Sequence, residues 1–409
     1  MVIVELVYER CCGIDVHKKM LAVCFKNGRK HEHRQIGTTT KEIKELSEWL
    51  LESGCQAIAM ESTGSFWKPI YNILELSGLE VMVVNAQHMK ALPGRKTDVS
   101  DAAWIADLLQ HGLLRASYIP DREQRELREI VRYRKSLIEE RSRELNRLQK
   151  MLEGANIKLA SFVKNINGKS SRNILNKIVA NEELGEKEVN ELLYRGMRKK
   201  LSDIMRAIDG SVSPLQRRLI GSILNHIDDM TRRIEDMDEI VKEYLTEYEE
   251  AIKALDEIPG IGRTGAETIL AEIGLDMSRF PTAAHLCSWA GIAPGNTESA
   301  GKRKSGKTTK GNPTLKTMLV QCAKAGKKVK DSFFYAQFER IAMRRGKNRA
   351  VVAVAHSMLI AIYHVLQNNT PYRDLGSDYY TKFNREKKIH AYLKKLLELG
   401  FAVSATATA

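Results

Sequence analysis

The first 118 residues alternate apolar runs of strand length with helical patterns, and this order restricts the fold more than any other feature of the sequence. Such runs are the main sequence signal of secondary structure. Strand-like runs lie near residues 11–16, 20–26, 31–37, 55–61 and 80–85, and helical patterns lie near 40–53, 66–77 and 98–112. Asn27-Gly28, after the second run, is a strong hairpin signal. We predict a three-stranded meander followed by helix, strand, helix, strand and helix.

This order is typical of a ribonuclease-H-like domain, and four acidic residues stand where its elements begin or end. Asp15 interrupts the first strand and Glu61 closes the fourth. Asp98 and Asp101 stand three apart at the start of the third helix, where they share one face. An ionised carboxylate within an apolar strand is costly unless it is paired or bound to metal. The four residues therefore predict a site for Mg²⁺, which prefers oxygen ligands.

The helical pair also has a simpler interpretation. Asp98 could cap the helix, and Asp101 could be stabilised by the positive end of the helix dipole. An isolated Asp-x-x-Asp usually has these roles, so the metal site depends on all four carboxylates together. One Mg²⁺ ion, or two ions about 4 Å apart, would hold a phosphodiester for in-line attack.

The chain is strongly basic, with a formal net charge of +14 from 65 Lys and Arg against 51 Asp and Glu among 409 residues. Such a chain attracts polyanions, and its length allows two or three domains. Between Glu298 and Asp331, ten basic residues occur without an acidic one. A solvated loop is the alternative, but we expect this segment to contact nucleic-acid phosphates. The residues expected to do so are Lys302, Arg303, Lys304, Lys307 and Lys310.

The six cysteines lie mostly in apolar runs and show no Cys-x-x-Cys spacing. They predict buried thiols in a reducing compartment and no zinc site. No cleavable signal opens the chain, and we expect no apolar stretch close to the roughly 18 uncharged residues that a membrane span needs. The expected location is the cytoplasm, with no membrane partner.

Residues 119–256 predict two long helices separated by an insert. Apolar residues at helical spacing run from Asp121 to about Ala155, and a second series steps three and four residues alternately from Ile220 to Leu255. The second series is typical of a coiled-coil seam. The helices could pair within one chain as an antiparallel hairpin or between chains in an oligomer, and we expect a mixture of the two. The insert, 156–212, predicts short helices near 174–179 and 192–197 and no chemistry.

Residues 257–403 predict a mostly helical domain, and the tail 404–409 is predicted to be disordered. The opening turn of the domain at 257–403, from Ile258 to Gly262, matches a helix-hairpin-helix, in which backbone N–H groups hold a DNA phosphate. We expect Gly260, Gly262 and Arg263 to make that contact, although an ordinary helix pair fits equally well. The segment 301–308 satisfies the phosphate-loop pattern, but no buried strand precedes it and Pro313 would break the helix after it. We therefore expect no nucleotide binding there.

Four motifs follow one another in a fixed order along the chain. They are Gly13-Ile14-Asp15-Val16-His17-Lys18, Glu61-Ser62-Thr63-Gly64, Lys96-Thr97-Asp98-Val99-Ser100-Asp101-Ala102, and a late block of Ala290-Gly291-Ile292-Ala293-Pro294 with Ser299-Ala300-Gly301 and Lys310-Gly311-Asn312. Together they resemble the insertion-sequence transposases that join a RuvC-like DEDD domain to a serine-bearing domain, known as bridge-RNA-guided recombinases. The resemblance covers nearly the whole chain. It departs at Ala300, because the family often has Gly directly after the serine.

The resemblance implies a role for each motif. The four carboxylates would form the metal-binding tetrad, and Ser299 would be the nucleophile that links covalently to a DNA end. A structured non-coding guide RNA would be a partner, and the two halves of the active site would come from different protomers of a homodimer or homotetramer. Lys18, in the first motif, is expected to contact nucleic acid.

Three functions are open at this point. The first is a DNA transposase-recombinase that cuts and rejoins strands through a phosphoserine intermediate. The second is a structure-selective endonuclease similar to a Holliday-junction resolvase, and the third is a non-catalytic coiled-coil protein that binds nucleic acid. We expect the first, on an α/β plus all-α fold. It would join a ribonuclease-H-like (RuvC-like) domain at 1–118 to coiled-coil helices and a mostly helical C-terminal domain with a helix-hairpin-helix.

Overall fold

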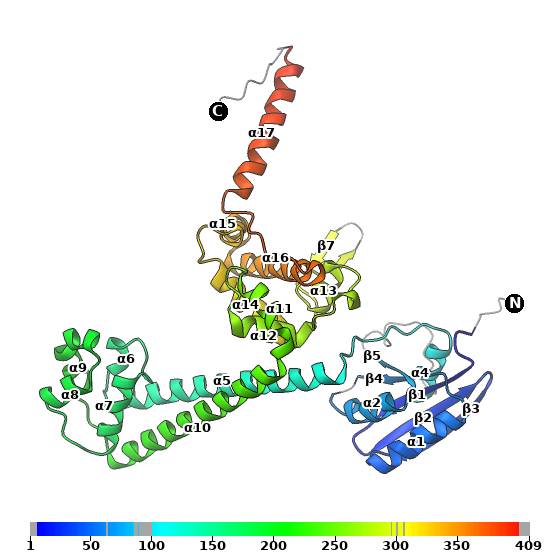
Figure 1. Ribbon diagram of the computed structural model, residues 1–409, viewed down its shortest axis with the longest axis horizontal. Coiled ribbons are helices and arrows are strands. Elements are labelled where there is room, and N and C mark those ends of the chain that lie inside the picture. The colour runs from blue at the N-terminus through cyan, green and yellow to red at the C-terminus, as the bar shows by residue number, and fades with distance from the viewer. Residues whose placement is uncertain are drawn as a thin grey trace. The chain divides into compact units, whose positions relative to one another are not determined.

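The computed structural model describes residues 6–62, 64–85, 89, 100–295, 297–299, 302–305 and 307–400, with the backbone alone for 297–299, 302–305 and 383–388 (Figure 1). Spatial contacts divide the chain into two compact units, Met1–Arg122 and Glu123–Ala409. The first boundary lies four residues beyond the predicted end of the first domain at residue 118. The further division of the second unit stays a prediction, and the predicted disordered tail lies outside the described residues.

The first unit is built on a five-stranded sheet of order β3-β2-β1-β4-β5. Its strands are β1 (Arg10–Val16), β2 (Met20–Asn27), β3 (Lys30–Gly37), β4 (Ala57–Glu61) and β5 (Glu80–Val84). The first three strands pair antiparallel, whereas β4 runs parallel to both β1 and β5. All five predicted strands are confirmed, and the order is compatible with the expected ribonuclease-H-like domain.

The position of each strand in the sheet follows from its composition. The central strands β1 and β4 are almost entirely buried, whereas β3, with the sequence KHEHRQIG, is exposed at the edge. Charged side chains on an edge strand discourage pairing with another chain. Gly28, with a φ of 57°, lies in the tight turn after Asn27, where positive φ favours glycine.

Helices cover both faces of the sheet. On one face, α1 (Thr40–Glu52) and α2 (Trp67–Leu76) pack their apolar side chains against Cys12, Ile14 and Ile58. On the other face, α4 (Asp101–Gln110) packs against Cys11, Ala57 and Ala59. Successive residues of a strand point to opposite faces. This separation therefore assigns the odd-numbered residues of β1 and β4 to the α4 face.

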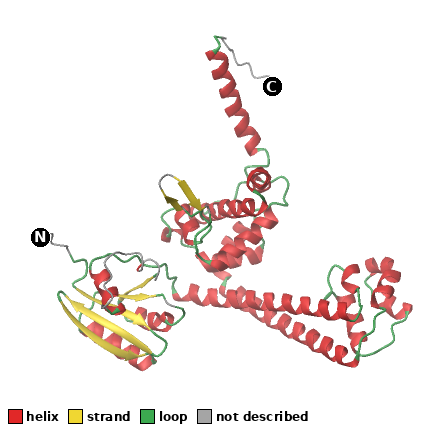
Figure 2. Cartoon of the chain, turned by 180° about the vertical axis from the view of Figure 1, so that it is seen from behind, coloured by secondary structure: helices red, strands yellow, loops and turns green. Residues whose placement is uncertain are grey.

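The second unit is mostly helical, and its two long helices pair within one chain (Figure 2). They are α5 (Arg122–Gly154) and α10 (Pro214–Tyr244). Arg134 Nη1 donates to Asp238 Oδ1 at 2.9 Å, and Arg141 Nη1 donates to Thr231 Oγ1 at 3.2 Å. The residue number of the partner on α10 falls as the number on α5 rises, so the two helices are antiparallel. This is the hairpin within one chain, one of the two expected arrangements; pairing between chains stays a prediction.

The predicted seam through Leu255 is wrong in its last third. The helix α10 ends at Tyr244, and a 3₁₀ turn, η2 (Thr246–Tyr248), leads into α11 (Glu249–Asp256). Ala251 and Leu255, which continue the heptad pattern in the sequence, lie on α11, where Leu255 is buried. This helix packs against α12 (Arg263–Ile273). The apolar spacing therefore continues although the helix does not.

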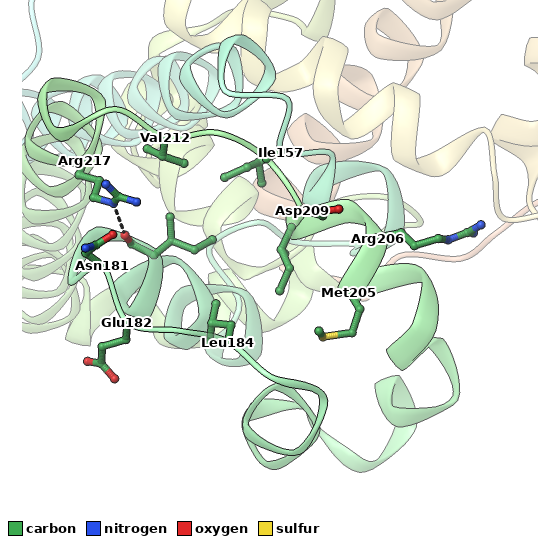
Figure 3. A pocket seen from close by; sticks show the side chains of 12 residues that line it. Ile157, Asn181, Glu182, Leu184, Met205, Arg206, Asp209, Val212 and Arg217 are labelled. Carbon is green, nitrogen blue, oxygen red and sulfur yellow. Dashed lines mark hydrogen bonds between the residues drawn. The ribbon is translucent and has the colours of Figure 1, made fainter.

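The insert is a small helical lobe at the ends of α5 and α10. It contains α6 (Leu159–Phe162), α7 (Lys169–Val179), α8 (Glu186–Leu192), η1 (Arg195–Lys200) and α9 (Leu201–Ile208). The helix predicted near 174–179 is therefore part of the longer α7, whereas 192–197 is no single helix, because α8 ends at Leu192. A pocket of about 460 Å³ opens beside α7 and α9, and at its edge Arg217 Nε donates to the carbonyl of Ile178 at 3.1 Å (Figure 3).

The remaining elements form the C-terminal part of the second unit. After α11 and α12 come η3 (Met277–Arg279), α13 (Ala283–Trp289), β6 (Thr297–Ser299), β7 (Lys302–Ser305), α14 (Pro313–Gly326), α15 (Phe333–Arg345), α16 (Lys347–Asn368) and α17 (Tyr379–Glu398). All six cysteines of the chain are buried and free, as predicted.

The expectation that no apolar stretch has the length of a membrane span is wrong. Among the described residues, α16 alone is long and apolar enough to cross a membrane by length and composition. Half of its apolar window is buried inside the unit, where α16 packs against α13, α14 and α15. Its uncharged sequence is explained by this central position in a protein core.

Candidate active site

Gly13 brings the start of α4 onto the centre of the sheet. A Cβ atom at this position would lie 2.3 Å from the carbonyl oxygen of Ala102 and 2.4 Å from the backbone nitrogen of Ala106. Contacts this short are impossible for a side chain, so only glycine lets the helix lie so close to β1. The first residue of that helix is Asp101, and its N-cap is Ser100, whose hydroxyl accepts from Ala103 N at 3.3 Å.

Asp15 and Glu61 lie level with each other at the ends of two parallel strands. Ile14 is paired with Met60, so the next residue along each strand is Asp15 or Glu61. Both have odd numbers and belong to the same face as Gly13 and Ala59, which is the face that α4 covers. Three of the four predicted carboxylates are therefore brought to one edge of the sheet from β1, β4 and α4. Asp98 lies outside the described residues.

The charges of these three carboxylates act on one another. Burial raises the pKa of Asp15 above its usual range, and the neighbouring charges of Asp101 and Glu61 raise it further. His17 opposes this rise in pKa, because its Nε2 lies 3.1 Å from Asp15 Oδ2. Like charges so placed repel each other, and a bound cation would relieve that repulsion.

The donor chemistry of the three residues fits a divalent cation. Each offers carboxylate oxygens, the ligands that hard cations prefer. Within the ranges that the structure describes, no three His, Cys, Asp or Glu side chains are already arranged around one ion.

Ser299 is the last residue of the first strand of a two-stranded hairpin, where the sequence indicated a loop. In this serine hairpin, formed by β6 and β7, Ser299 pairs with Lys302 and Glu298 pairs with Arg303. Pro294 forms an isolated bridge with Thr308 at the base of the hairpin. The segment with the phosphate-loop pattern thus contains the strand β7, and the next helix begins only at Pro313. No helix follows the pattern directly, as the sequence around it predicted.

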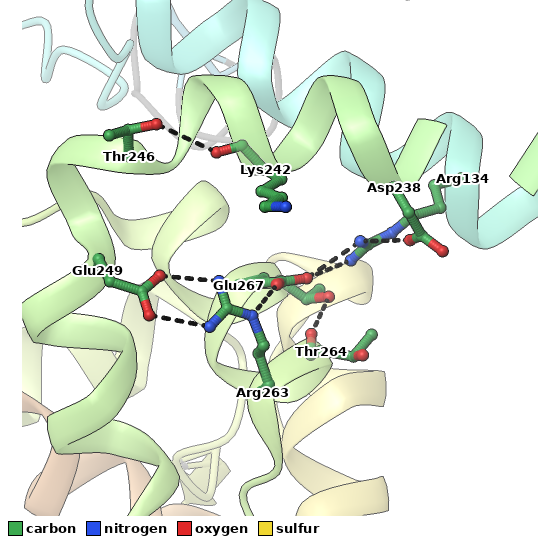
Figure 4. A network of polar contacts seen from close by, with 9 residues as sticks. Arg134, Asp238, Lys242, Thr246, Glu249, Arg263, Thr264 and Glu267 are labelled. Carbon is green, nitrogen blue, oxygen red and sulfur yellow. Dashed lines mark hydrogen bonds and ion pairs between the residues drawn. The ribbon is translucent and has the colours of Figure 1, made fainter. Parts of the chain in front are cut away.

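Two of the three residues named for the expected helix-hairpin-helix, Gly260 and Arg263, make contacts inside the second unit. Gly260 has a φ of 94°, and a Cβ there would lie 2.3 Å from the backbone nitrogen of Gly326, so the turn packs against the end of α14. Arg263 donates to both carboxylate oxygens of Glu249, at 3.0 and 2.8 Å, and to Glu267 at 3.1 Å (Figure 4). Gly262 is exposed at the start of α12.

The remaining residues predicted to bind nucleic acid are one in the first unit, Lys18, and five in the second, Lys302, Arg303, Lys304, Lys307 and Lys310. Lys18, Lys307 and Lys310 are exposed. The backbone of Lys302, Arg303 and Lys304 forms β7. A role in phosphate contact stays a prediction for all six residues.

Sequence reasoning missed the buried carboxylate of Glu272 and its partner Asn312. The Glu272 side chain is fully buried and accepts from Arg132 Nε at 2.7 Å and from Asn312 Nδ2 at 2.6 Å. The sequence signal for Glu272 was the same as for Asp15, a charged residue inside an apolar run. For Glu272 this run is Ile269-Leu270-Ala271-Glu272-Ile273. Asn312 directly before Pro313 was in turn a helix-start signal.

Comparisons with known proteins match two segments of the chain to transposase domains. Residues 12–157 match the DEDD domain of IS110 elements, described as Transposase, and residues 252–338 match the Transposase IS116/IS110/IS902 family. The first match contains Asp15, Glu61 and Asp101, and the second contains Glu272, Ser299 and Asn312.

Several curated proteins are similar over most of the chain. The transposase for insertion sequence element IS1111A of Coxiella burnetii is 23% identical, over 88% of this chain and 87% of its own length. The probable family 20 transposase of Pseudomonas aeruginosa is 22% identical, over 88% of this chain and 98% of its own. A protein of the insertion element IS110 from Streptomyces coelicolor is 28% identical, over 68% of this chain and 73% of its own.

A DEDD transposase domain indicates the use of a divalent metal ion, and a transposase binds DNA. The two matched domains and these relatives together show that the chain is an insertion-sequence transposase of the IS110 family, an enzyme that carries a DEDD domain.

Proposed function

We propose that this transposase cuts and rejoins DNA strands through a covalent link between Ser299 and a DNA end, with Mg²⁺ held by Asp15, Glu61, Asp98 and Asp101. The observation that carries the proposal is the convergence of Asp15, Glu61 and Asp101 on one sheet edge, where the charges of the other two raise the pKa of Asp15. The assignment of Ser299 and Asp98 rests on the resemblance of their motifs to the family.

In the cleavage step, Ser299 Oγ forms a bond to phosphorus while the bond between phosphorus and one deoxyribose oxygen breaks. The serine proton is lost, and the departing sugar oxygen gains a proton. When bound, the metal ion would polarise the phosphate and offset its developing charge. The basic residues on β7, Lys302, Arg303 and Lys304, would add positive charge close to the nucleophile. Rejoining is the reverse step, with a deoxyribose hydroxyl of another strand as the attacking group.

The proposed assembly rests on the resemblance to the family. The two halves of the active site, the carboxylates of the first unit and the serine hairpin of the second, would come from different protomers of a homodimer or homotetramer. A structured RNA encoded by the element would pair with both DNA partners, which rests on the resemblance alone. The enzyme would work in the cytoplasm, at the nucleoid, where its DNA substrates are.

A second candidate is a structure-selective endonuclease in which the same carboxylates activate water. The convergence of Asp15, Glu61 and Asp101 supports this function equally well, because it says nothing about the nucleophile. We do not retain the non-catalytic hypothesis, because the chain is a transposase.

A covalent-adduct assay distinguishes the two candidates. Labelled element-end DNA is incubated with the enzyme and Mg²⁺, and protein-linked DNA is separated on a denaturing gel. We expect an adduct with the wild type and with Ser305→Ala, a serine of the same hairpin, and none with Ser299→Ala. Cut DNA without any protein-linked product would favour the water-based endonuclease, and a normal adduct with Ser299→Ala would exclude this nucleophile.

A further inference from the structure

Glu272 lies where the long helix α5 meets the end of α12. Gln124, Arg128 and Arg132 stand four apart on α5 and therefore share one face of the helix. Gln124 Nε2 and Arg128 Nε donate to the carbonyl of Ala271, at 3.3 and 3.2 Å, and Arg128 also donates to the carbonyl of Glu272. These contacts satisfy carbonyls at the end of α12 that have no partner within the helix.

The side chain of Glu272 joins that face of α5 to the start of α14. Arg132 donates to both of its carboxylate oxygens, at 2.7 and 2.8 Å, and Asn312 Nδ2 donates to Oε2 at 2.6 Å. Asn312 is also the N-cap of α14, where its Oδ1 accepts from Thr314 N and Leu315 N at 3.1 Å each. Both ends of the Asn312 amide are therefore engaged, one by α14 and one by a fully buried carboxylate.

The segment that ends at Asn312 is the return leg of the serine hairpin. At the base of the hairpin this leg lies against the outgoing leg. Gly295 N donates to the carbonyl of Lys307 at 2.8 Å, and a Cβ on Gly311 would lie 2.3 Å from Gly291 N. Lys316 Nζ on α14 adds a contact to Thr308 Oγ1 at 2.5 Å. The two legs therefore have little freedom to move independently, and their position depends on where Asn312 is held.

We propose that Glu272 is a positioning residue, which holds the serine hairpin at a fixed place relative to α5 through its contact with Asn312. This inference rests on the proposed role of Ser299. A displacement of the nucleophile by about 1 Å can cost about a hundredfold in rate, so a shift at the base of the hairpin would slow the chemical step. No residue of this contact touches DNA in the role we assign to it.

A pair of reciprocal substitutions tests the contact. Asn312→Asp keeps the cap of α14, because Asp accepts hydrogen bonds at an N-cap as well as Asn does. It replaces the Nδ2 donor with an oxygen, however, and places one carboxylate against another. We expect it to slow adduct formation on element-end DNA by about tenfold or more, the effect of an unsatisfied buried polar group. Adding Glu272→Gln restores a donor opposite the introduced carboxylate and should return most of the lost rate.

The sign of the Glu272→Gln effect is the decisive readout. In the wild-type background the substitution weakens the bond to Arg132 and should slow the reaction. In the Asn312→Asp background it should accelerate the reaction, which a residue with a merely structural role would not do. Glu267→Gln is the matched control, because Glu267 is a nearly buried carboxylate of the same helix that accepts two bonds from Arg134, at 3.0 Å each. It should not rescue Asn312→Asp.

Hydrogen exchange separates this inference from the proposed function. Amides between Lys307 and Leu315 should exchange faster in Asn312→Asp than in the wild type and return toward the wild-type rate in the double variant, whatever the nucleophile is. The inference is overturned if Asn312→Asp forms adduct at the wild-type rate, or if Glu272→Gln and Glu267→Gln rescue it equally. A normal adduct with Ser299→Ala would instead overturn the nucleophile assignment and leave the exchange result standing.

Discussion

Gly13 lies directly against Ala102, so closely that a Cβ atom on the strand would sit 2.3 Å from the carbonyl oxygen of the helix. This contact sets the distance from the sheet to the first turn of α4, and hence from Asp15 to Asp101. The carboxylate site therefore depends on a residue that has no functional group.

We predict that Gly13→Ala abolishes most DNA cleavage while the first unit still folds. The added methyl group forces α4 outward, and overpacking of this kind typically costs about 1–3 kcal/mol of stability. The measurement is cleavage of element-end DNA beside the midpoint of thermal unfolding. Gly154→Ala is the control, since a Cβ there meets nothing within 4 Å. Full cleavage by Gly13→Ala would show that the close approach is not needed.

Asp15 should destabilise the metal-free protein. The pKa of its carboxyl is raised in the folded state, by burial first and then by the charges of Asp101 and Glu61. A group with a raised folded pKa binds its proton more tightly when folded, so its contribution to stability falls as the pH rises from the unfolded pKa through the folded one. Above that window, in EDTA, Asp15→Asn should therefore raise the midpoint of thermal unfolding.

The same substitution should remove the stabilisation by metal. Mg²⁺ should raise the unfolding midpoint of the wild type, because a ligand that binds only the folded state stabilises it. It should raise that of Asp15→Asn much less. Asp107→Asn, on the same helix as Asp101 but paired with Lys26, serves as the control and should keep the response to Mg²⁺. An equal response of all three proteins would contradict the metal site.

The sequence was sufficient for the architecture of the first unit because its signals are local. Apolar runs and Asn27-Gly28 located the strands, and strand ends located Asp15 and Glu61. The end of α10 was missed, since Ala251 and Leu255 keep the heptad spacing on a separate helix. The Glu272 contact was missed for a different reason, because it joins α5, α12 and Asn312 across long stretches of chain, which no local pattern reports.

Arg263 should contribute little to DNA binding despite its place in the predicted helix-hairpin-helix. Its guanidinium is bound to Glu249 and Glu267, and these ion pairs raise its pKa further above its usual range. Lys310→Ala should reduce the salt dependence of DNA affinity by about one unit of slope, as expected for one lost phosphate contact. Arg263→Ala should reduce it by less. Filter-binding titrations at several salt concentrations measure both slopes, and equal losses would restore Arg263 as a phosphate ligand.

Two inactive variants should restore each other when mixed. If the carboxylates and Ser299 of one active site come from different protomers, a hetero-oligomer of Asp15→Ala and Ser299→Ala contains one site in which both halves are intact. Recombination should then reappear in the mixture, although each protein alone has none. A mixture as inactive as its components, despite verified exchange of protomers, would place both halves of the site in one chain.

The origin of the oxygen atoms in the rejoined DNA tests the central claim most directly. Recombination is carried out in ¹⁸O-labelled water, and the protein-linked intermediate is digested and sequenced by mass spectrometry. The account predicts a nucleotide attached to Ser299 and rejoined strands that contain no ¹⁸O, because no water enters either step. Cleaved ends that carry ¹⁸O on phosphate, with no modified serine, would contradict it and identify water as the nucleophile.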